Sequence, residues 1–149
     1  MQLQSIFVFA SLPVLLFAQT TPAQIESDIN VLATLLADDL AAIDAFPIEG
    51  GTIDEAMAIH TADTNVNDIL VTITNDIKTA SCPLSDSDAS VILDLAEARA
   101  PTIQQALADA VAREPGLAAV GAVPTIRDDL ATLQASSDAM GAALVGCVS

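Results

Sequence analysis

The sequence predicts an all-α fold, an up-down bundle of four or five helices closed by one disulfide. Alanine, the best intrinsic helix former, is abundant, and aromatic residues make up only 3% of the 149 residues. Leu, Ile and Val recur every three or four residues in successive segments, which is the spacing of one apolar helix face. Proline, glycine and clustered Ser and Asp residues separate these segments. Beyond its first residues, the chain has the composition of a single domain.

Residues 1–18 have the composition of a signal peptide. No charged residue occurs between Ser5 and Ala18, and the apolar run there is too short to span a bilayer as a helix. Ala18 is a suitable small residue for cleavage, which leaves a mature helical-bundle domain of residues 19–149. The first residues carry no Lys or Arg, so a buried N-terminal helix is the alternative. We expect a secreted, extracellular protein.

The charge of the chain limits its partners. Its formal net charge is −16, with 20 acidic residues against the cations Lys78, Arg99, Arg113 and Arg127. Phosphate binding needs clustered Lys and Arg, so nucleic acid is not expected as a partner, and anionic lipid headgroups are repelled. The charge favours a soluble monomer. We expect neither a transmembrane span nor a lipid anchor, because residues 146–149 lack an apolar tail.

The first predicted helix begins after Thr21, which is followed by Pro and then by Gln three residues after the cap. It ends at Phe46-Pro47 and Gly50-Gly51. Asp38 and Asp39 are predicted to lie off its apolar stripe. That stripe consists of Ile25, Ile29, Leu32, Leu36, Leu40 and Ile43.

The second predicted helix begins at Thr52 and stops at Cys82-Pro83. Asp54 and Glu55 in its first turn suit the positive end of the helix dipole. Its apolar stripe consists of Ala56, Ile59, Val66, Ile69, Leu70, Ile73 and Ile77.

A third helical segment begins at the N-cap cluster of residues 85–88 and ends at Pro115-Gly116. Pro101 lies in its middle and either kinks this helix or splits it in two. An Ala/Gly/Val loop then leads to Pro124 and the last helix. The apolar residues are Ile92, Leu95, Ala96, Ile103, Leu107 and Val111 in the third segment, and Ile126, Leu130, Leu133, Met140 and Leu144 in the last.

The two cysteines test this topology. Cys82 follows the second predicted helix and Cys147 the last, and in an up-down bundle those helix ends lie at the same pole. Two cysteines in a secreted chain are expected to pair. A Cys82–Cys147 disulfide would stabilise the fold by about 4 kcal/mol in the chain-entropy model. A free catalytic thiol is the alternative.

No enzyme signature occurs in the chain. His60 is the single histidine, and without a second His or a free thiol we interpret it as a partly exposed polar residue. Residues 63–67 imitate the opening of a calcium loop, but Asp68 replaces the turn glycine and Thr74 the bidentate Glu, which favours a solvated helix face. Adjacent carboxylates such as Asp128-Asp129 could in principle form an acid/base couple. Among 20 acidic residues, however, such adjacent pairs are expected by chance. We expect no enzymatic activity, metal or cofactor.

Several patterns extend from about Ile25 to Leu144. They are Ile29-x-x-Leu32-x-x-x-Leu36, the turn Gly50-Gly51, the Ser85-Asp86 cap, Ala98-x-x-Pro101-x-Ile103-x-x-x-Leu107, Val123-Pro124 and Asp129-Leu130-x-x-Leu133. In these patterns the chain resembles the fungal hydrophobic surface binding protein A family and the related cell-wall galactomannoprotein antigens. The resemblance implies a secreted or cell-wall-associated helical bundle that adsorbs to hydrophobic surfaces, assists secreted polyester-degrading hydrolases or encloses fatty acids.

Two departures from the family pattern refine this expectation. The predicted disulfide restrains opening of the bundle, which favours an enclosed ligand over unfolding onto a surface. The stretch at Arg113-Glu114 is less basic than the family pattern, which weighs against recruitment of a partner enzyme.

We therefore predict an apolar cavity that binds a fatty-acid-like ligand, with a filled core as the structural alternative. The predicted lining residues are Leu32, Leu36, Ile73, Ile103, Leu107, Leu133 and Met140. A secreted protein-binding inhibitor or effector is the alternative function, because plant inhibitors of pectin methylesterase and invertase are also disulfide-stapled helical bundles. Those inhibitors carry more cysteines than this chain and an N-terminal helical hairpin, which this chain lacks. A hydrolase is a third and weaker possibility.

Overall fold

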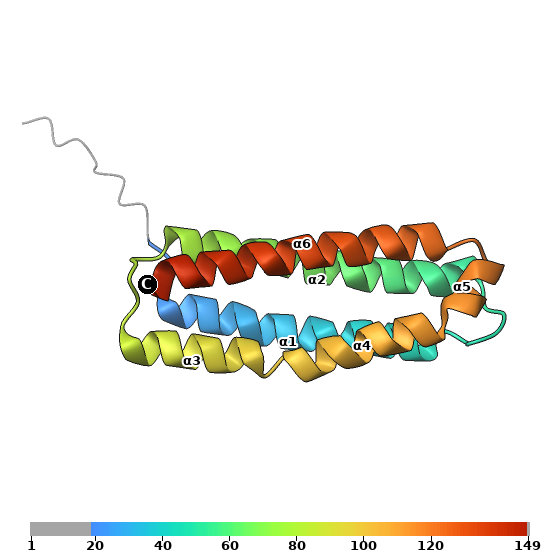
Figure 1. Ribbon diagram of the computed structural model, residues 1–149, viewed down its shortest axis with the longest axis horizontal. Helices are drawn as coiled ribbons and strands as arrows, with labels where there is room; N and C mark the ends of the chain where they lie inside the picture. The colour runs from blue at the N-terminus through green and yellow to red at the C-terminus, as the bar shows by residue number, and fades with distance from the viewer. Residues whose placement is uncertain (1–18, 149) are drawn as a thin grey trace, which may run out of the picture.

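The computed structural model describes residues 19–148, which contain six helices and no strand. The longest are α1 (Pro22–Ala45), α2 (Ile53–Thr79) and α6 (Val123–Val148), while α3 (Asp86–Glu97) and α4 (Ala100–Ala112) follow each other along one side of the bundle (Figure 1). The short α5 (Glu114–Ala119) lies at the end of the bundle opposite the C-terminus. The predicted all-α up-down bundle is confirmed. The predicted signal peptide lies outside the described residues.

The helices pack in a fixed order around the bundle. α1 packs against α2, α3 and α4, and α6 packs along α2. Figure 1 shows α1 and the α3–α4 pair on one side of the bundle and α2 with α6 on the other. Among the helices of residues 19–148, none combines the length and the apolar character that crossing a membrane requires.

Side-chain caps fix the starts of three helices where the sequence predicts them. The Thr21 hydroxyl accepts a hydrogen bond from the Gln24 amide at 3.2 Å, with Pro22 in the first turn. Thr52 and Glu55 form a reciprocal capping box at the start of α2. Ser85 accepts from the amide of Asp88 at 3.2 Å. These caps satisfy amides that the helices themselves leave unpaired.

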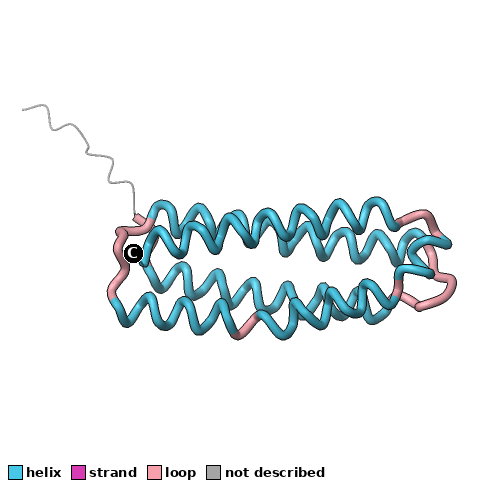
Figure 2. The backbone as a smooth tube through the Cα atoms, in the orientation of Figure 1, coloured by secondary structure: helices cyan, strands magenta, loops and turns pink. Residues whose placement is uncertain are grey.

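Pro101 splits the third predicted segment in two. α3 ends at Glu97 and α4 begins at Ala100, so that Pro101 lies in the first turn of α4. A proline is tolerated there because the amide it lacks would have no partner in the helix. Figure 2 shows the break as a short loop between two helical stretches.

The predicted loop between Pro115-Gly116 and Pro124 is only partly present, because residues 117–119 belong to α5 and residues 120–122 alone connect α5 to α6. Pro115 lies in the first turn of α5 and begins a short helix, and Leu117 on that helix is buried. Gly116 packs so closely on the α1–α2 turn that a Cβ atom would lie 2.5 Å from the carbonyl oxygen of Pro47. Burial of Leu117 and this close contact explain why a six-residue segment is helical.

The predicted disulfide is confirmed. Cys82 and Cys147 are bonded across a separation of 65 residues, at the pole where α2 and α6 end. The amide of Leu84 donates a hydrogen bond of 2.9 Å to the carbonyl oxygen of Cys147. The segment between α2 and α3 is therefore held to the end of α6 by a covalent bond and a backbone hydrogen bond.

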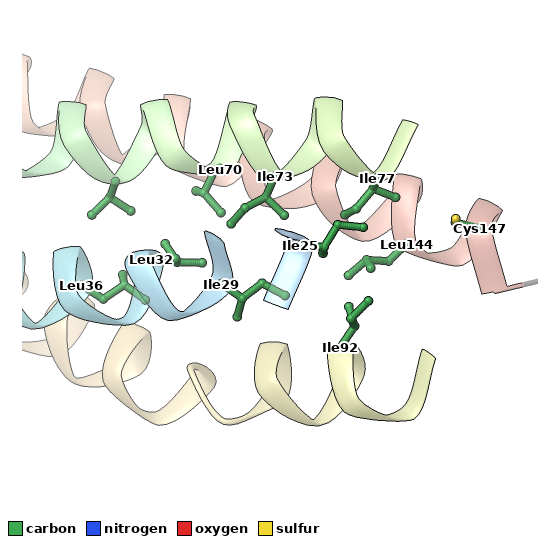
Figure 3. Packing of buried hydrophobic residues seen from close by; sticks show 11 residues of the cluster. Ile25, Ile29, Leu32, Leu36, Leu70, Ile73, Ile77, Ile92, Leu144 and Cys147 are labelled. Atoms are coloured by element: carbon green, nitrogen blue, oxygen red, sulfur yellow. The ribbon is translucent and has the colours of Figure 1, made fainter. Parts of the chain in front are cut away.

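Two apolar clusters fill the two ends of the bundle. The first lies at the disulfide pole, where side chains of α1, α2, α3 and α6 converge (Figure 3). The second surrounds Phe46 at the other end and includes Leu117 of α5 and Ile126 of α6. The first cluster consists of Ile25, Ile29, Leu32, Leu36, Val66, Leu70, Ile73, Ile77, Ile92, Leu144 and Cys147.

Candidate ligand cavity

A cavity of about 630 Å³ lies within the bundle; we call it the central cavity. This volume falls within the range of about 300–1,000 Å³ that is typical of small-molecule sites. Its wall draws on both apolar clusters and on the α3–α4 junction. The lining residues are Ile29, Leu32, Leu36, Asp39, Ile43, Asp63, Val66, Leu70, Ala96, Arg99, Ile103, Ala106, Leu107, Leu130, Ala131, Leu133, Gln134, Ser137 and Met140.

The packing of α4 explains why space remains there. Ala106 and Ala110 are buried, whereas Ile103, Leu107 and Val111 are 39, 45 and 69% exposed. The predicted apolar face of this half-segment is therefore only partly correct: Ile103 and Leu107 line the cavity, whereas Val111 is exposed because α4 packs through its small residues. The longer side chains of Ile103 and Leu107 stand at the wall of the central cavity and remain partly in solvent. The cavity thus reaches the surface beside α4.

Six of the seven predicted lining residues surround this cavity. They are Leu32, Leu36, Ile103, Leu107, Leu133 and Met140. The seventh, Ile73, does not line the cavity; it is fully buried in the first cluster. Figure 3 shows Ile73 between Leu70 and Ile77 on α2, at the densely packed part of the bundle. Leu70, one turn earlier, takes its place in the cavity wall.

Two acidic residues that the sequence placed on solvated faces are buried in the cavity wall. Asp39 is 4% exposed and Asp63 is 2% exposed. Residues 63–67 lie on a helix as predicted, but the solvated position predicted for Asp63 is wrong, as is the position of Asp39 off the stripe. Asp39 lies three residues after Leu36, and Asp63 lies midway in the seven-residue gap between Ile59 and Val66. These spacings place both carboxyl groups on the buried faces of their helices.

Burial changes the titration of both carboxyl groups. It raises the pKa of Asp39 from 3.8 to about 6. Burial also raises the pKa of Asp63 to about 7, and the negative charges of Asp39 and Asp129 add to this effect while His60 opposes it. One oxygen of each residue, Asp39 Oδ1 and Asp63 Oδ2, is buried without a hydrogen-bond partner. The two buried carboxyl groups of Asp39 and Asp63 form what we call the polar region of the cavity wall, which also contains the polar side chains of Arg99, Gln134 and Ser137.

His60 and Asp129 lie next to this polar region. The Nδ1 atom of His60 is 2.8 Å from Oδ2 of Asp129, and the two side chains are 35 and 15% exposed. His60 is partly exposed, as predicted, and it also joins α2 to α6. Within residues 19–148, no three His, Cys, Asp or Glu side chains are grouped so that they could hold a metal ion.

Arg99 is the one cation among the described residues that line the cavity. It lies at the α3–α4 junction and is half-buried, and its Nε atom is buried without a partner. Neither Arg99 nor the two aspartates were predicted as site residues. The spacing of Asp39 and Asp63 along their stripes could have indicated them, whereas Arg99 lies at a helix break that has no periodicity.

Comparison with known proteins agrees with this architecture. The profile of the family described as hydrophobic surface binding protein A matches residues 22–146. The crystal structure of AfMP4p in complex with palmitic acid has a similar fold, with a TM-score of 0.80 and 23% sequence identity over 87% of this chain and 83% of that chain. No curated protein sequence matches significantly. Because the family profile spans all six helices except the end of α6, the chain belongs to the hydrophobic surface binding protein A family.

Proposed function

We propose that this chain is a secreted, non-enzymatic protein that holds the acyl chain of a fatty-acid-like ligand in the central cavity. The main observation behind this proposal is the cavity itself, which has a volume of about 630 Å³ and is lined mainly by Leu, Ile, Val, Ala and Met side chains. Each methylene group transferred from water into such surroundings contributes about 0.8 kcal/mol. A long acyl chain is therefore a favourable occupant.

The opening beside α4 provides a route for the ligand. Ile103 and Leu107 line the cavity and are also 39 and 45% exposed, so an acyl chain can contact them before it is enclosed. A structure of similar fold, that of AfMP4p, was determined in complex with palmitic acid. That similarity supports a fatty acid as the first ligand to test.

The same edge of α4 supports adsorption to an apolar surface. Val111, one helical turn beyond Leu107, is 69% exposed and extends the apolar strip toward solvent. Outside the cell, such a strip would contact wax or polyester, and a bound polyester hydrolase would be the further partner. Arg113 does not serve as a docking cation for that enzyme, because it donates hydrogen bonds to the Phe46 carbonyl oxygen and to Asp44 and its side chain is 13% exposed.

Filling the cavity tests the proposal. Leu133→Trp places a large side chain in the cavity wall, and Leu93→Trp on the exposed face of α3 is its matched control. The chain contains no Trp, so the emission of each variant reports on one position. We expect Leu133→Trp to bind palmitic acid at least about tenfold more weakly, a loss of about 1.4 kcal/mol.

The control is expected to bind palmitic acid like the unmodified protein, with an emission spectrum that the ligand leaves unchanged. Equal affinities in the two variants, with unchanged helical circular dichroism, would remove the central cavity as the binding site.

Depletion of the protein by polyester particles tests surface adsorption. Val111→Ser is expected to reduce this depletion, and Val71→Ser on α2, which is 44% exposed, is expected to leave it unchanged.

A further inference from the structure

The polar region of the central cavity lacks internal partners. Asp39 of α1 and Asp63 of α2 are both more than nine-tenths buried, and both line the cavity. One oxygen of each is buried without a hydrogen bond. Buried polar atoms in folded proteins are ordinarily hydrogen-bonded, and one that is left without a partner destabilises the folded state. Two such oxygens in the wall of one cavity indicate that a donor from outside the chain completes the site.

The surrounding charges define which donor is suitable. Asp129 of α6 raises the pKa of Asp63 further, and His60 of α2 counteracts it only in part. The hydrogen bond of His60 goes to Asp129, so it does not satisfy the free oxygen of Asp63. Arg99 lines the cavity at the α3–α4 junction, and it forms no ion pair with Asp39 or Asp63. The region therefore accepts hydrogen bonds and repels additional negative charge.

We propose that Asp39 and Asp63 form a headgroup site that selects amphiphiles whose headgroup donates a hydrogen bond, an alcohol or an undissociated carboxylic acid, over a carboxylate anion. This inference rests on the proposed binding of an acyl chain in the central cavity. The donor satisfies the free carboxyl oxygens, whereas a carboxylate would place a further negative charge beside them in surroundings of low polarity.

The shape of the cavity agrees with this placement. The wall runs along α1 from Ile29 to Ile43. The part between Ile29 and Asp39 covers ten residues and spans about 15 Å at about 1.5 Å per residue. Leu70 and Met140 line the part of the cavity that lies toward the disulfide pole. An amphiphile with its headgroup at Asp39 and Asp63 thus has an apolar path for its chain in the direction of that pole.

Arg99 defines the opposite outcome. If its guanidinium anchors the ligand, a carboxylate is the preferred headgroup, and the two aspartates contribute nothing to selectivity. The two arrangements predict opposite orders of affinity for ligands that differ only in their headgroup.

The test compares palmitic acid, hexadecan-1-ol and hexadecane, which share one chain length. Affinities are measured by competition with a fluorescent fatty acid at about pH 5 and about pH 8, on either side of the pKa values of about 6 and about 7. At the higher pH we expect hexadecanol to bind at least about tenfold more tightly than palmitate, the equivalent of about 1.4 kcal/mol. Raising the pH should weaken palmitic acid binding and leave hexadecanol binding nearly constant.

Two variants locate the effect. Asp39→Asn with Asp63→Asn removes both charges and retains the side-chain shape, so the preference for hexadecanol at the higher pH should fall to about twofold or less. Asp28→Asn is the matched control, because Asp28 is also buried with one unpartnered oxygen but lies outside the cavity wall. It should retain the preference.

Each alternative result has a distinct meaning. Tighter binding of palmitate than of hexadecanol at the higher pH, abolished by Arg99→Gln, would overturn the headgroup assignment in favour of Arg99. An unchanged preference in the double variant would also overturn it. Failure of all three ligands to bind the unmodified protein would instead overturn the proposed function. The pH comparison on the unmodified protein stands even if a variant fails to fold.

Discussion

The imidazole of His60 lies 2.8 Å from the carboxylate of Asp129, and this pair links α2 to α6 beside the buried Asp63. Because His60 is positive when protonated and Asp129 is negative, the two neighbours act on Asp63 in opposite directions. Burial and the charge of Asp39 raise the pKa of Asp63 more than either of these neighbours changes it, and the pair adjusts how much negative charge Asp63 carries near neutral pH.

Substitutions of this pair should move the pKa of Asp63 in opposite directions. Burial is the largest cause of its elevation to about 7, so the elevation should persist in both variants. Asp129→Asn removes a negative charge and should lower the pKa, whereas His60→Gln removes the opposing positive charge and should raise it. Carboxyl carbon chemical shifts followed over pH measure both changes. Shifts in the same direction in the two variants would contradict this account.

The stability of the fold should fall as the pH rises from about 4 to about 7. The pKa values of Asp39 and Asp63 are raised in the folded state from 3.8 to about 6 and about 7, so the folded state retains protons that the unfolded chain has already released. Below about pH 4 both states hold these protons, and the free energy of unfolding levels off. Each unit of elevation corresponds to about 1.4 kcal/mol, so the two groups together can contribute several kcal/mol.

Urea denaturation of the ligand-free protein over this pH range measures the slope. The double variant Asp39→Asn with Asp63→Asn should flatten it. Asp28→Asn should flatten it less, because that substitution removes only the effect of Asp28 on the raised pKa of Asp76. A slope unchanged in the double variant would assign the pH dependence to the overall charge of −16.

Removal of the disulfide should lower the free energy of unfolding by about 4 kcal/mol. The estimate follows from the entropy that a cross-link over 65 residues removes from the unfolded chain. The paired variant Cys82→Ser with Cys147→Ser, compared with the oxidised protein by thermal unfolding, tests it. Because Cys147 is 1% exposed, Cys147→Ala in place of Ser controls for burial of a hydroxyl group. A change under about 1 kcal/mol would indicate that the reduced unfolded chain is already compact.

Addition of one methyl group should have opposite effects at two glycines. A Cβ atom at Gly116 would lie 2.5 Å from the Pro47 carbonyl oxygen, so Gly116→Ala should displace α5 and destabilise the fold by about 1–3 kcal/mol. Gly141 lies inside α6 with no atom within 4 Å of the added group. Gly141→Ala should stabilise the protein by about 0.5–1 kcal/mol, because alanine loses less backbone entropy in a helix. Equal melting temperatures of the two variants would argue against the contact between α5 and the α1–α2 turn.

Local chemistry made much of the fold predictable. The caps at Thr21, Thr52 and Ser85, the break at Pro101 and the pairing of the cysteines all follow from interactions within a few residues or from helix order. The short α5 was missed, because a six-residue helix around Pro115 and Gly116 depends on burial of Leu117 against distant parts of the chain.

The predicted cavity lining shows the same division. Leu32, Leu36, Leu133 and Met140 line the cavity because apolar periodicity places them on inward faces. Periodicity cannot distinguish a residue in a filled core from one at an empty space, and Ile73 is accordingly in the core. Ile103 and Leu107 line the cavity while partly exposed, because the packing of α4 through Ala106 and Ala110 sets its rotation.

The sequence by itself determined that the chain forms helices, where most of them begin and end, and that one disulfide joins two of them, since these features depend on backbone propensity, capping and helix order. Only the tertiary structure decided that α4 packs through alanine, that a cavity remains beside it, and that Asp39 and Asp63 face that cavity. The physical reason is that a helix's rotation and its distance from its neighbours depend on how side chains from several helices fit together. Spacing within one segment defines a face, and the neighbouring segments decide whether that face meets protein, solvent or a ligand.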